Sequence, residues 1–441
     1  MSTLSRRHFL AAGAAAAAPL IVPSRVLGQG GNPGPNDQIA IGCIGLGGMG
    51  NSHRGWLTDV ADDARVVALC DCDTQRLGAG ASHYEDGEVD LYTDYRQLLD
   101  RDDIDAVVVA TPDHNHAVPM VHACQAGKHV YVEKPASKTV AEGHAMIAAA
   151  REHGRTVQVG SQGRVLARFP SICEFIRNGE LGTVQEVCCW HYENREGGEA
   201  EDQEPPDYLD WDKWLGPARW RPFNPDYVQQ FGDRRFFLDF GGGMIFDRGT
   251  HQLNVMSWFL DLDDTGPTKV TATGRPPRYG NFDCPITMSV TWEFAHRDLV
   301  VHWRQPGFDP QSPEQDRPYG AIYHGTKGSL AVDGGDIGGR AWPLREAEEY
   351  EAPAGGFQAP RTELHSQPGL RRDWLDCIKS GEEPLMPIEA GHRISSMCTL
   401  GNVAYMLGRP IEWDPENERA INDEEANRML LHEPGRGRWH V

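Results

Sequence analysis

Two separate segments of the chain carry residue types that suit proton transfer at a hydroxyl group. Lys134 lies in Val132-Glu133-Lys134-Pro135, at the end of an apolar run, and the proline restricts the backbone that follows it. Asp247 and His251 stand four residues apart, ahead of an apolar repeat with helical spacing. A histidine titrates near neutrality, so His251 can accept a hydroxyl proton while Asp247 orients it and balances its charge.

Each of these residues also has an ordinary structural explanation. A lysine in a turn is usually exposed to solvent. A histidine beside an aspartate near a helix start is commonly an ion pair or a capping arrangement. A chemical role therefore requires that the rest of the chain bring Lys134, Asp247 and His251 to one pocket beside a redox cofactor.

The glycine pattern after the first apolar run predicts such a cofactor. Gly45, Gly47 and Gly50 follow the run 39–44 with the spacing GxGxxG, which suits a dinucleotide pyrophosphate at a strand-to-helix turn. The first glycine permits the turn, the second allows the backbone to approach the phosphates, and the third allows helix and strand to pack closely. The cofactor-binding residues expected in this loop are Gly45, Leu46, Gly47, Gly48, Met49 and Gly50.

An acidic residue after the second apolar run indicates which dinucleotide binds. Asp71 follows the run 66–70 and lies 21 residues after Gly50, where a carboxylate holds the ribose hydroxyls of NAD. Asp73 is a second candidate, and no arginine or lysine lies between Val66 and Asp73 to bind the 2′-phosphate of NADP. We therefore predict NAD; the alternative is a glycine-rich turn between ordinary strands.

The order of apolar runs and helical segments predicts an α/β fold with a doubly wound parallel sheet. In such sheets ligands bind outside the carboxyl ends of the strands, so the residues that follow each run are the candidates for the site. The expected runs are 66–70, 106–110, 129–132 and 156–159, separated by helices such as 118–126 and 141–153. The residues expected to border the cofactor after these runs are Thr111, Pro112, His116, Glu133 and Lys134.

The character of the sequence changes after about residue 160. Tryptophan, proline and glycine are frequent between residues 196 and 224. Alternating strand-like runs follow at 269–273, 286–294 and 299–303, which predicts a mostly antiparallel open sheet in a second, α+β domain. This domain would close over the cofactor crevice.

The first 28 residues are typical of a twin-arginine export signal. Arg6 and Arg7 precede the apolar stretch 9–22, which is too short to span a bilayer comfortably. We expect cleavage near Gly28, a linker over 29–37 and a periplasmic location; the alternative is a frayed helical leader. Because such a chain is exported already folded, and NAD is scarce outside the cytoplasm, we expect the cofactor to be tightly held.

The composition excludes several partners. With 42 basic and 64 acidic side chains the net charge is −22, which disfavours nucleic acid and anionic membranes, and we expect no membrane insertion. Neutral sugars fit such a surface better than polyanions. The ten cysteines show no CxxC pair and no zinc-type spacing, so we expect free buried thiols and no metal.

Together these motifs resemble the Gfo/Idh/MocA family of oxidoreductases, named after glucose-fructose oxidoreductase, inositol dehydrogenase and a rhizopine catabolism protein. The resemblance runs from about residue 39 to 414 and is most specific in Glu133-Lys134-Pro135 and the Asp247–His251 pair. The segments 210–217, 323–330 and 387–393 resemble those of an exported subgroup of the family that is common in sugar-degrading bacteria.

The resemblance implies a function and a division of the chain. It implies a Rossmann NAD-binding domain at 38–160 and a substrate-binding and oligomerisation domain at 161–441, in a homo-oligomer, either a dimer or a tetramer. The expected reaction is NAD-dependent oxidation of a secondary alcohol of a small-molecule carbohydrate (a sugar, glycoside or cyclitol). By this resemblance Lys134 polarises the reacting oxygen, His251 acts as acid and base, and Asp247 supports it.

Two departures and two alternatives qualify this expectation. Asn254 replaces an aspartate that many members carry three residues after the histidine, and the stretch 195–235 is longer than in compact members. One alternative is an NAD-using glycosidase or epimerase, in which hydride is removed and returned in one cycle. The other is a non-catalytic protein that senses sugar or NAD.

Overall fold

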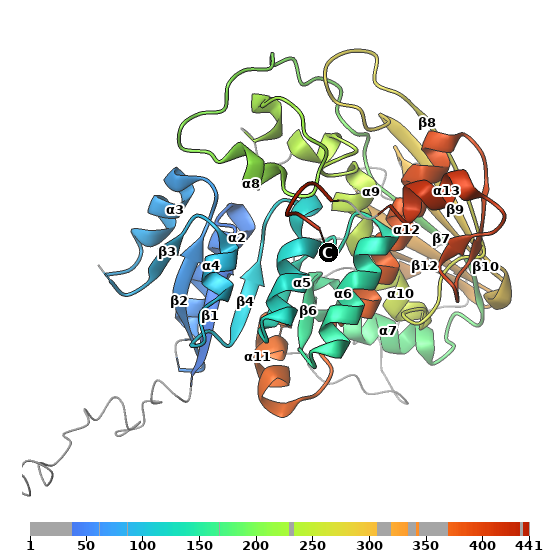
Figure 1. Ribbon diagram of the computed structural model, residues 1–441. Helices are drawn as coiled ribbons and strands as arrows, with labels where there is room; N and C mark the ends of the chain where they lie inside the picture. Colours follow the sequence, from blue (N-terminus) through green and yellow to red (C-terminus); the bar gives the residue numbers. More distant parts are fainter. Residues whose placement is uncertain are drawn as a thin grey trace, which may run out of the picture.

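A computed structural model describes residues 38–60, 62–85, 87–166, 168–228, 233–306, 319–333, 341–343, 369–432 and 435–440 (Figure 1). The expected signal segment 1–28 and linker 29–37 lie outside the described residues. The described part contains two sheets, which confirms the predicted fold class. None of its helices combines the length and the apolar character that crossing a bilayer requires.

The first sheet is parallel throughout, and its strands follow the order β3-β2-β1-β4-β5-β6. The central strands are apolar along their whole length because helices cover both faces of the sheet, and every residue of β1 and β4 is buried. The chain leaves β1 toward β2 on one side and later returns to β4 on the other, so a crevice forms at the carboxyl ends of β1 and β4. The strands are β1 Ile39–Ile44, β2 Ala64–Cys70, β3 Asp90–Tyr92, β4 Ala106–Val109, β5 His129–Glu133 and β6 Val157–Gly160.

The helices of this domain begin at positions that the sequence marks clearly. Asp73 and Asp94 cap their helices by accepting from backbone amides, and Thr139 and Glu142 form a reciprocal capping box. The sequence predicted two of these helices to within one residue at each end, but it missed the short strand β3 and the short helix α4. The helices are α2 Gly48–Asp59, α3 Thr74–Ala81, α4 Tyr95–Leu99, α5 Ala117–Gln125 and α6 Val140–Glu152.

The second sheet has nine strands in the order β13-β12-β11-β7-β10-β9-β8-β14-β15. All pairings are antiparallel except that of β10 with β7, as predicted for a mostly antiparallel sheet. Strand β7 lies near the middle of the sheet and was not predicted from the sequence. The strands are β7 Val184–Trp190, β8 Lys269–Arg275, β9 Thr287–Phe294, β10 Leu299–Gln305, β11 Gly320–Gly325, β12 Gly328–Asp333, β13 Ala341–Pro343, β14 Ile411–Asp414 and β15 Arg419–Ala420.

Helices between the two sheets join the domains. The long helix α12 packs against α6 of the first domain and against α10 and β8 of the second. A Cβ atom on Gly143 of α6 would lie 1.8 Å from Nδ1 of His392 on α12, so this contact requires glycine. The helices are α7 Phe169–Arg177, α8 Trp211–Leu215, α9 Met244–Asp247, α10 Gly249–Leu260, α11 Leu370–Ser380, α12 Ile388–Leu407 and α13 Glu424–Leu430.

Two segments from the end of the chain return to the first domain. Helix α11 packs against β5 and β6, with its Trp374 ring 5.7 Å from that of Tyr131. Residues 435–440 lie beside α4, where Arg96 approaches the ring of Trp439. The division of the chain at residue 160 therefore separates the two sheets, but later residues still cover the first one.

Candidate active site

A cavity of about 420 Å³ lies at the carboxyl ends of the strands of the first sheet. It receives the loops after β1, β2, β4 and β5, and the second domain closes its open side. Of the predicted cofactor-binding residues, all except Gly50 line it: Gly45, Leu46, Gly47, Gly48, Met49, Asp71, Thr111, Pro112, His116, Glu133 and Lys134.

The glycine loop has the geometry that a pyrophosphate site needs. Gly45 adopts φ +89°, and a Cβ atom there would lie 2.6 Å from the carbonyl oxygen of Ala110. A Cβ atom on Gly50 would lie 1.9 Å from the carbonyl oxygen of Gly45, so Gly50 supports the loop from behind. Gly47 precedes the first turn of α2, whose unpaired amides attract an anion.

Asp71, rather than Asp73, is the carboxylate in the cavity. Its Oδ2 accepts from the amide of Leu46 at 2.7 Å and its Oδ1 from the amide of Asp73 at 2.9 Å, and burial raises its pKa. Asp73 instead caps α3. Arg76 also lines the cavity, although the sequence analysis did not consider it; its Nε lies 3.4 Å from Oδ2 of Asp73.

His116 holds the loops after β4 and β5 together. Its Nδ1 lies 2.7 Å from the carbonyl oxygen of Pro135, and its Nε2 lies 2.9 Å from that of Thr111. Carbonyl oxygens only accept, so the ring forms both bonds at once when both of its nitrogens carry protons. This predicted residue therefore acts on the cavity wall through the positions of its neighbours.

Lys134 and Asp247 meet across the two domains. The Nζ atom of Lys134 lies 2.9 Å from Oδ1 of Asp247 and 3.0 Å from its carbonyl oxygen. The preceding Glu133 points back into the first domain, where its Oε1 lies 2.8 Å from Nε2 of His53 on α2. Burial alone would raise the pKa of Glu133, but the hydrogen bond from His53 and the nearby charges outweigh it and lower that pKa.

Three cations surround the single carboxylate of Asp247. Besides Lys134, Arg235 approaches it to 3.0 Å and Arg248 to 3.6 Å. Burial works against ionisation, but the charges of Lys134 and Arg235 hold the pKa of Asp247 well below its usual range. Arg235 was missed because its only sequence hint is its position six residues before the glycine-rich segment 241–243.

The structure differs from the expectation that Asp247 orients His251. Asp247 ends α9 and His251 lies in the first turn of α10, with the helix interrupted at Arg248. Among the described contacts no hydrogen bond joins Asp247 to His251, because Lys134 and Arg235 occupy the carboxylate oxygens. Asp247 therefore positions Lys134.

His251 lies close to Lys134 but outside the residues that line the cavity. Burial lowers the pKa of His251 to about 3, and the charge of Lys134 acts in the same direction. The imidazole is therefore neutral at pH 7, the form that accepts a proton. In the chain, His251 follows Asp247, the partner of Lys134, by four residues.

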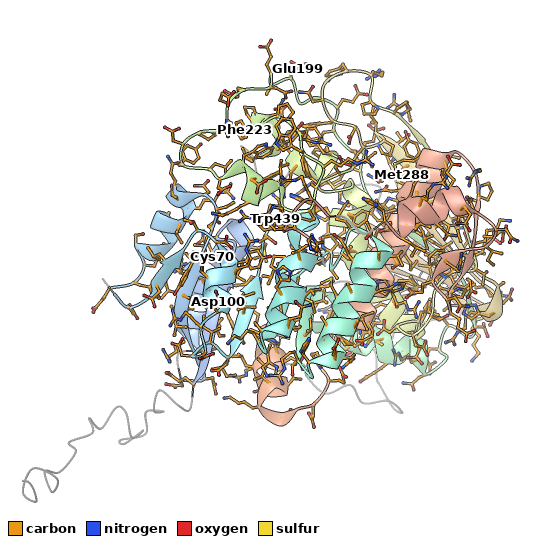
Figure 2. All side chains as sticks on the ribbon, viewed as in Figure 1. Cys70, Asp100, Glu199, Phe223, Met288 and Trp439 are labelled. Carbon is orange, nitrogen blue, oxygen red and sulfur yellow. The ribbon has the colours of Figure 1, made fainter. Side chains whose placement is uncertain are left out.

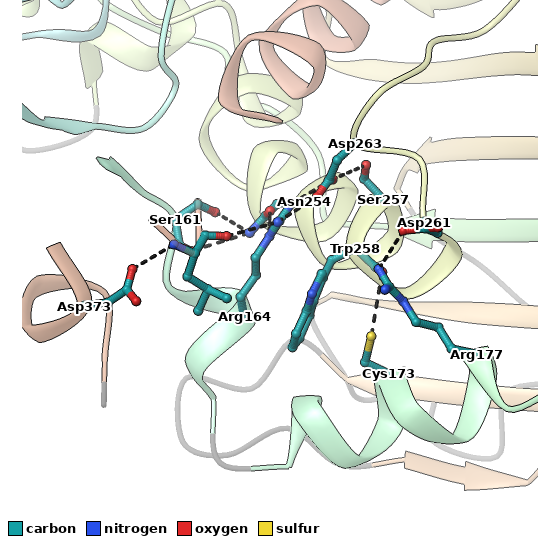
Figure 3. Close-up of polar contacts among 11 residues, drawn as sticks. Ser161, Arg164, Cys173, Arg177, Asn254, Ser257, Trp258, Asp261, Asp263 and Asp373 are labelled. Atoms are coloured by element: carbon teal, nitrogen blue, oxygen red, sulfur yellow. Dashed lines mark hydrogen bonds and ion pairs between the residues drawn. The ribbon is translucent and has the colours of Figure 1, made fainter. Parts of the chain in front are cut away.

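A buried polar network fixes the helix that carries His251 (Figure 3). Asn254 is fully buried; its Oδ1 accepts from Nε of Arg164 at 2.8 Å, and its Nδ2 donates to Oγ of Ser161 at 2.9 Å. Arg164 also forms two bonds with Asp263, at 2.7 and 2.8 Å. The charge that an aspartate would bring to position 254 is therefore supplied by Asp263.

One cluster in the described part has donor atoms that suit a metal ion: His144, His392 and Glu418. The Glu418 carboxylate accepts from both histidines, with distances of 2.7 to 2.9 Å. Nη1 of Arg393 lies 2.7 Å from the same carboxylate. Because a guanidinium opposes a second cation there, we interpret the cluster as a hydrogen-bonded ion pair between the domains.

The fold and the site define a class of protein. The parallel sheet carries the glycine loop after its first strand, a carboxylate placed to bind ribose after the second, and a lysine after a later one. This arrangement defines a dinucleotide-dependent oxidoreductase. The chain matches the family described as "Oxidoreductase family, NAD-binding Rossmann fold" over residues 39–161. It matches the companion "Oxidoreductase family, C-terminal alpha/beta domain" over residues 183–330 and 358–441. The chain therefore belongs to the Gfo/Idh/MocA family of oxidoreductases, and its cofactor is NAD, as predicted.

Similar proteins of known sequence include oxidoreductases and cyclitol dehydrogenases. "Uncharacterized oxidoreductase YrbE" of Bacillus subtilis is 27% identical over 302 residues, which cover 67% of this chain and 74% of that protein. The inositol 2-dehydrogenase of Rubrobacter xylanophilus is 33% identical over 159 residues, 36% of this chain and 45% of that enzyme. The chain thus matches less than half the length of this inositol 2-dehydrogenase.

Solved structures share the fold over most of the chain. The WlbA dehydrogenase from Bordetella pertussis, in complex with NADH and UDP-GlcNAcA, has a TM-score of 0.63 at 20% identity and covers 86% of this chain and 99% of its own. The aldose-aldose oxidoreductase from Caulobacter crescentus, complexed with glycerol, has a TM-score of 0.57 at 22% identity, with 85% and 99% covered. At these identities the similarity establishes the fold.

Proposed function

We propose that this protein is an NAD-dependent oxidoreductase that oxidises a secondary alcohol of a sugar, glycoside or cyclitol and keeps its cofactor tightly bound. The observation that carries the proposal is the meeting of Lys134 and Asp247 at the cavity wall, 2.9 Å apart, with His251 nearby. The carbohydrate and cyclitol dehydrogenases among the similar proteins support the substrate class. Export by the twin-arginine route and a homo-oligomeric state are part of the proposal.

The residues present fit NAD. The cradle at Gly45 and Gly47 admits phosphates close to the backbone, and Asp71 offers a fixed carboxylate to the ribose. When bound, NAD supplies the hydride acceptor for the oxidation.

The chain's own residues then handle the alcohol. The ammonium group of Lys134 donates a hydrogen bond to the alcohol oxygen and stabilises the negative charge that develops there. The neutral imidazole of His251 takes the hydroxyl proton. Asp247 holds the lysine in place, and Arg235 keeps Asp247 ionised, so the donor is oriented before the reaction begins.

A second candidate is a closed hydride cycle, as in a glycosidase or epimerase that uses NAD without consuming it. The enclosure of the cavity by α8 and residue 439 favours this variant, because a retained cofactor must be regenerated in place. A purely sensing protein is less well supported, since binding alone needs no lysine held by an aspartate beside a neutral histidine.

The proposal is tested on protein purified from cells that process its leader. The released nucleotide is identified by mass, and sugars and cyclitols are screened for a change in the 340 nm band of the nicotinamide. Lys134→Ala should lower hydride transfer by about 10³-fold and leave the NAD content unchanged. Lys327→Ala, which removes an exposed lysine bonded to the carbonyl of Gly179, is the matched control.

Two outcomes separate the alternatives. Full turnover in Lys134→Ala would remove this lysine from the mechanism. With a glycoside deuterated at C3, net formation of NADH excludes the closed cycle, whereas turnover without net NADH supports it.

A further inference from the structure

We infer that the adenosine half of the NAD site is completed from outside the Rossmann domain, by α8 and the C-terminal turn 435–440. We call these two elements the cover. Trp439 and Lys213 line the cavity together with Asp71, although they lie far from it in the sequence. The inference rests on NAD binding and holds whatever alcohol is oxidised. Its consequence is that the cover, rather than the glycine loop alone, sets how long NAD stays bound.

One end of the cover is fixed beside the ribose-binding carboxylate. The amide of Asp210 donates to the carbonyl of Cys72 at 3.0 Å, and the amide of Thr74 donates to the carbonyl of Tyr208 at 2.9 Å. The chain that enters α8 is thus paired, strand to strand, with the residues directly after Asp71. Asp210 then caps α8 by accepting from the amide of Lys213.

The other end of α8 is fixed beside the loop after β4. Nε2 of His114 lies 3.1 Å from the carbonyl oxygen of Trp214. Gly216, at the end of the helix, packs so closely on Asn115 that a Cβ atom would lie 2.7 Å from the Asn115 side-chain oxygen. Helix α8 therefore spans the mouth of the crevice from the end of β2 to the end of β4.

The C-terminal turn locks this helix in place. The guanidinium of Arg436 donates to the carbonyl oxygens of Asp212, Gly216 and Ala218 at 3.0, 3.1 and 3.3 Å, so it ties the turn to α8 and to the residues directly after it. It also pairs with the carboxylate of Asp212. Figure 1 shows the dark red C-terminal segment running back toward α8 and α5, in agreement with these contacts.

Trp439 is the residue of the C-terminal turn that lines the cavity. It is 2% exposed, and its Nε1 donates to Oδ2 of Asp212 at 3.3 Å. The Arg96 guanidinium lies 4.5 Å from the centre of its ring, and the Tyr95 ring lies 6.2 Å away. Figure 2 labels Trp439 and Cys70, which come from opposite ends of the chain and line the same cavity.

The chemistry of this end suits a purine nucleoside. Aromatic surfaces bind a flat base by stacking and contact, and the carboxylate of Asp71 binds the ribose. Lys213, held by Asp210 at 2.9 Å, adds a cation to the same end of the cavity. The residues that form this end of the cavity are Asp71, Thr93, Tyr95, Lys213 and Trp439. Release of NAD then requires that the bonds of Arg436 to α8 break.

The test measures retention of NAD, with no substrate present. Purified protein loaded with NAD is passed rapidly into nucleotide-free buffer, and bound nucleotide is followed over time after acid release. Trp439→Ala should speed dissociation by about 10-fold or more, the equivalent of one lost base contact. Arg436→Ala, which leaves the tryptophan in place and removes its anchor, should act in the same direction.

The control is Trp220→Ala, since Trp220 is 67% exposed and lies just after α8. It should retain NAD like the unaltered protein. Thermal unfolding without nucleotide shows whether each variant is folded, and Trp439→Phe, which keeps an aromatic ring, provides a milder variant if alanine does not fold. Because the test follows bound NAD without substrate, a failed sugar screen would leave it intact. Unchanged dissociation in folded Trp439→Ala and Arg436→Ala would overturn the inference.

Discussion

The two ends of the cavity are built in different ways. At the reactive end, Lys134, Arg235 and Arg248 crowd around the single carboxylate of Asp247, within 3.6 Å. At the adenosine end the contacts are backbone hydrogen bonds to Asp71 and the packed ring of Trp439. In the proposed function, the first end stabilises charge that appears only during the reaction, and the second holds NAD between reactions.

The excess of positive charge at the reactive end stands out against a chain with a net charge of −22. Three cations share one ionised carboxylate, so the region attracts the negative charge that develops on an alcohol oxygen. In the proposed reaction, the neutral imidazole of His251 accepts the proton and adds no further charge in the ground state. Removing a charged side chain should therefore lower turnover at the reactive end and weaken NAD binding at the adenosine end.

The largest effect is expected from Asp247→Asn. Without the carboxylate, the amine of Lys134 and the guanidinium of Arg235 lose their shared partner, and the lysine is no longer held in place. We expect kcat to fall by about 10²- to 10³-fold with NAD content unchanged, measured by turnover and by nucleotide release. Asp103→Asn, which removes a carboxylate from an exposed pair with Arg101, should leave both quantities unaltered. If the NAD content and kcat fell by the same factor, the two ends of the cavity would not act independently.

A smaller effect, at the opposite end, is expected from Asp71→Ala. This variant removes the ribose-binding carboxylate and leaves the amides of Leu46 and Asp73 without their acceptor. We expect the dissociation constant of NAD to rise about 10- to 100-fold, corresponding to hydrogen bonds with a charged group, while kcat at saturating NAD changes little. Titration of NAD against intrinsic fluorescence measures the first quantity.

Asp73→Ala is the matched comparison for Asp71→Ala. It removes the cap of α3, so it should lower stability by about 1 kcal/mol and leave the affinity for NAD nearly unchanged. The reverse pattern, with Asp73 controlling affinity, would mean that the ribose carboxylate had been assigned to the wrong residue.

The sequence was most informative where a signal is local. The glycine spacing, Asp71 and Lys134 each follow a buried strand, and the carboxyl ends of parallel strands meet at one edge of the sheet. The spacing predicted Asp247 and His251 on one face near a helix start, and the family resemblance predicted a shared site with Lys134. The break at Arg248, which decides what the carboxylate contacts, follows from tertiary packing.

The cover could not be predicted for a different reason. Helix α8 has five residues, too few for a hydrophobic period, and it is stabilised by contacts with loops one hundred or more residues away in sequence. The contact of Trp439 with Arg96 has no local signal at all. The sequence marks this region only by frequent tryptophan, proline and glycine over 196–224, which names no packing partner.

The smallest expected effect concerns pH and again separates the two ends. Burial lowers the pKa of His114, beneath the cover, to about 3, and its Nδ1 has no hydrogen-bond partner in the described structure. Because the folded pKa lies below the unfolded value near 6.5, the stabilisation is complete above pH 6.5 and is lost as the pH falls toward 3. At pH 5.5 the loss should be about 1 kcal/mol.

His114→Gln, which keeps a donor for the Trp214 carbonyl, should reduce the fall of Tm between pH 7 and 5. His83→Gln, at an exposed site, should leave this fall of Tm unaltered. If only His251→Gln reduced the fall of Tm, the loss of stability in acid would arise at the reactive end of the cavity. The cover would then make no contribution to the pH dependence of stability.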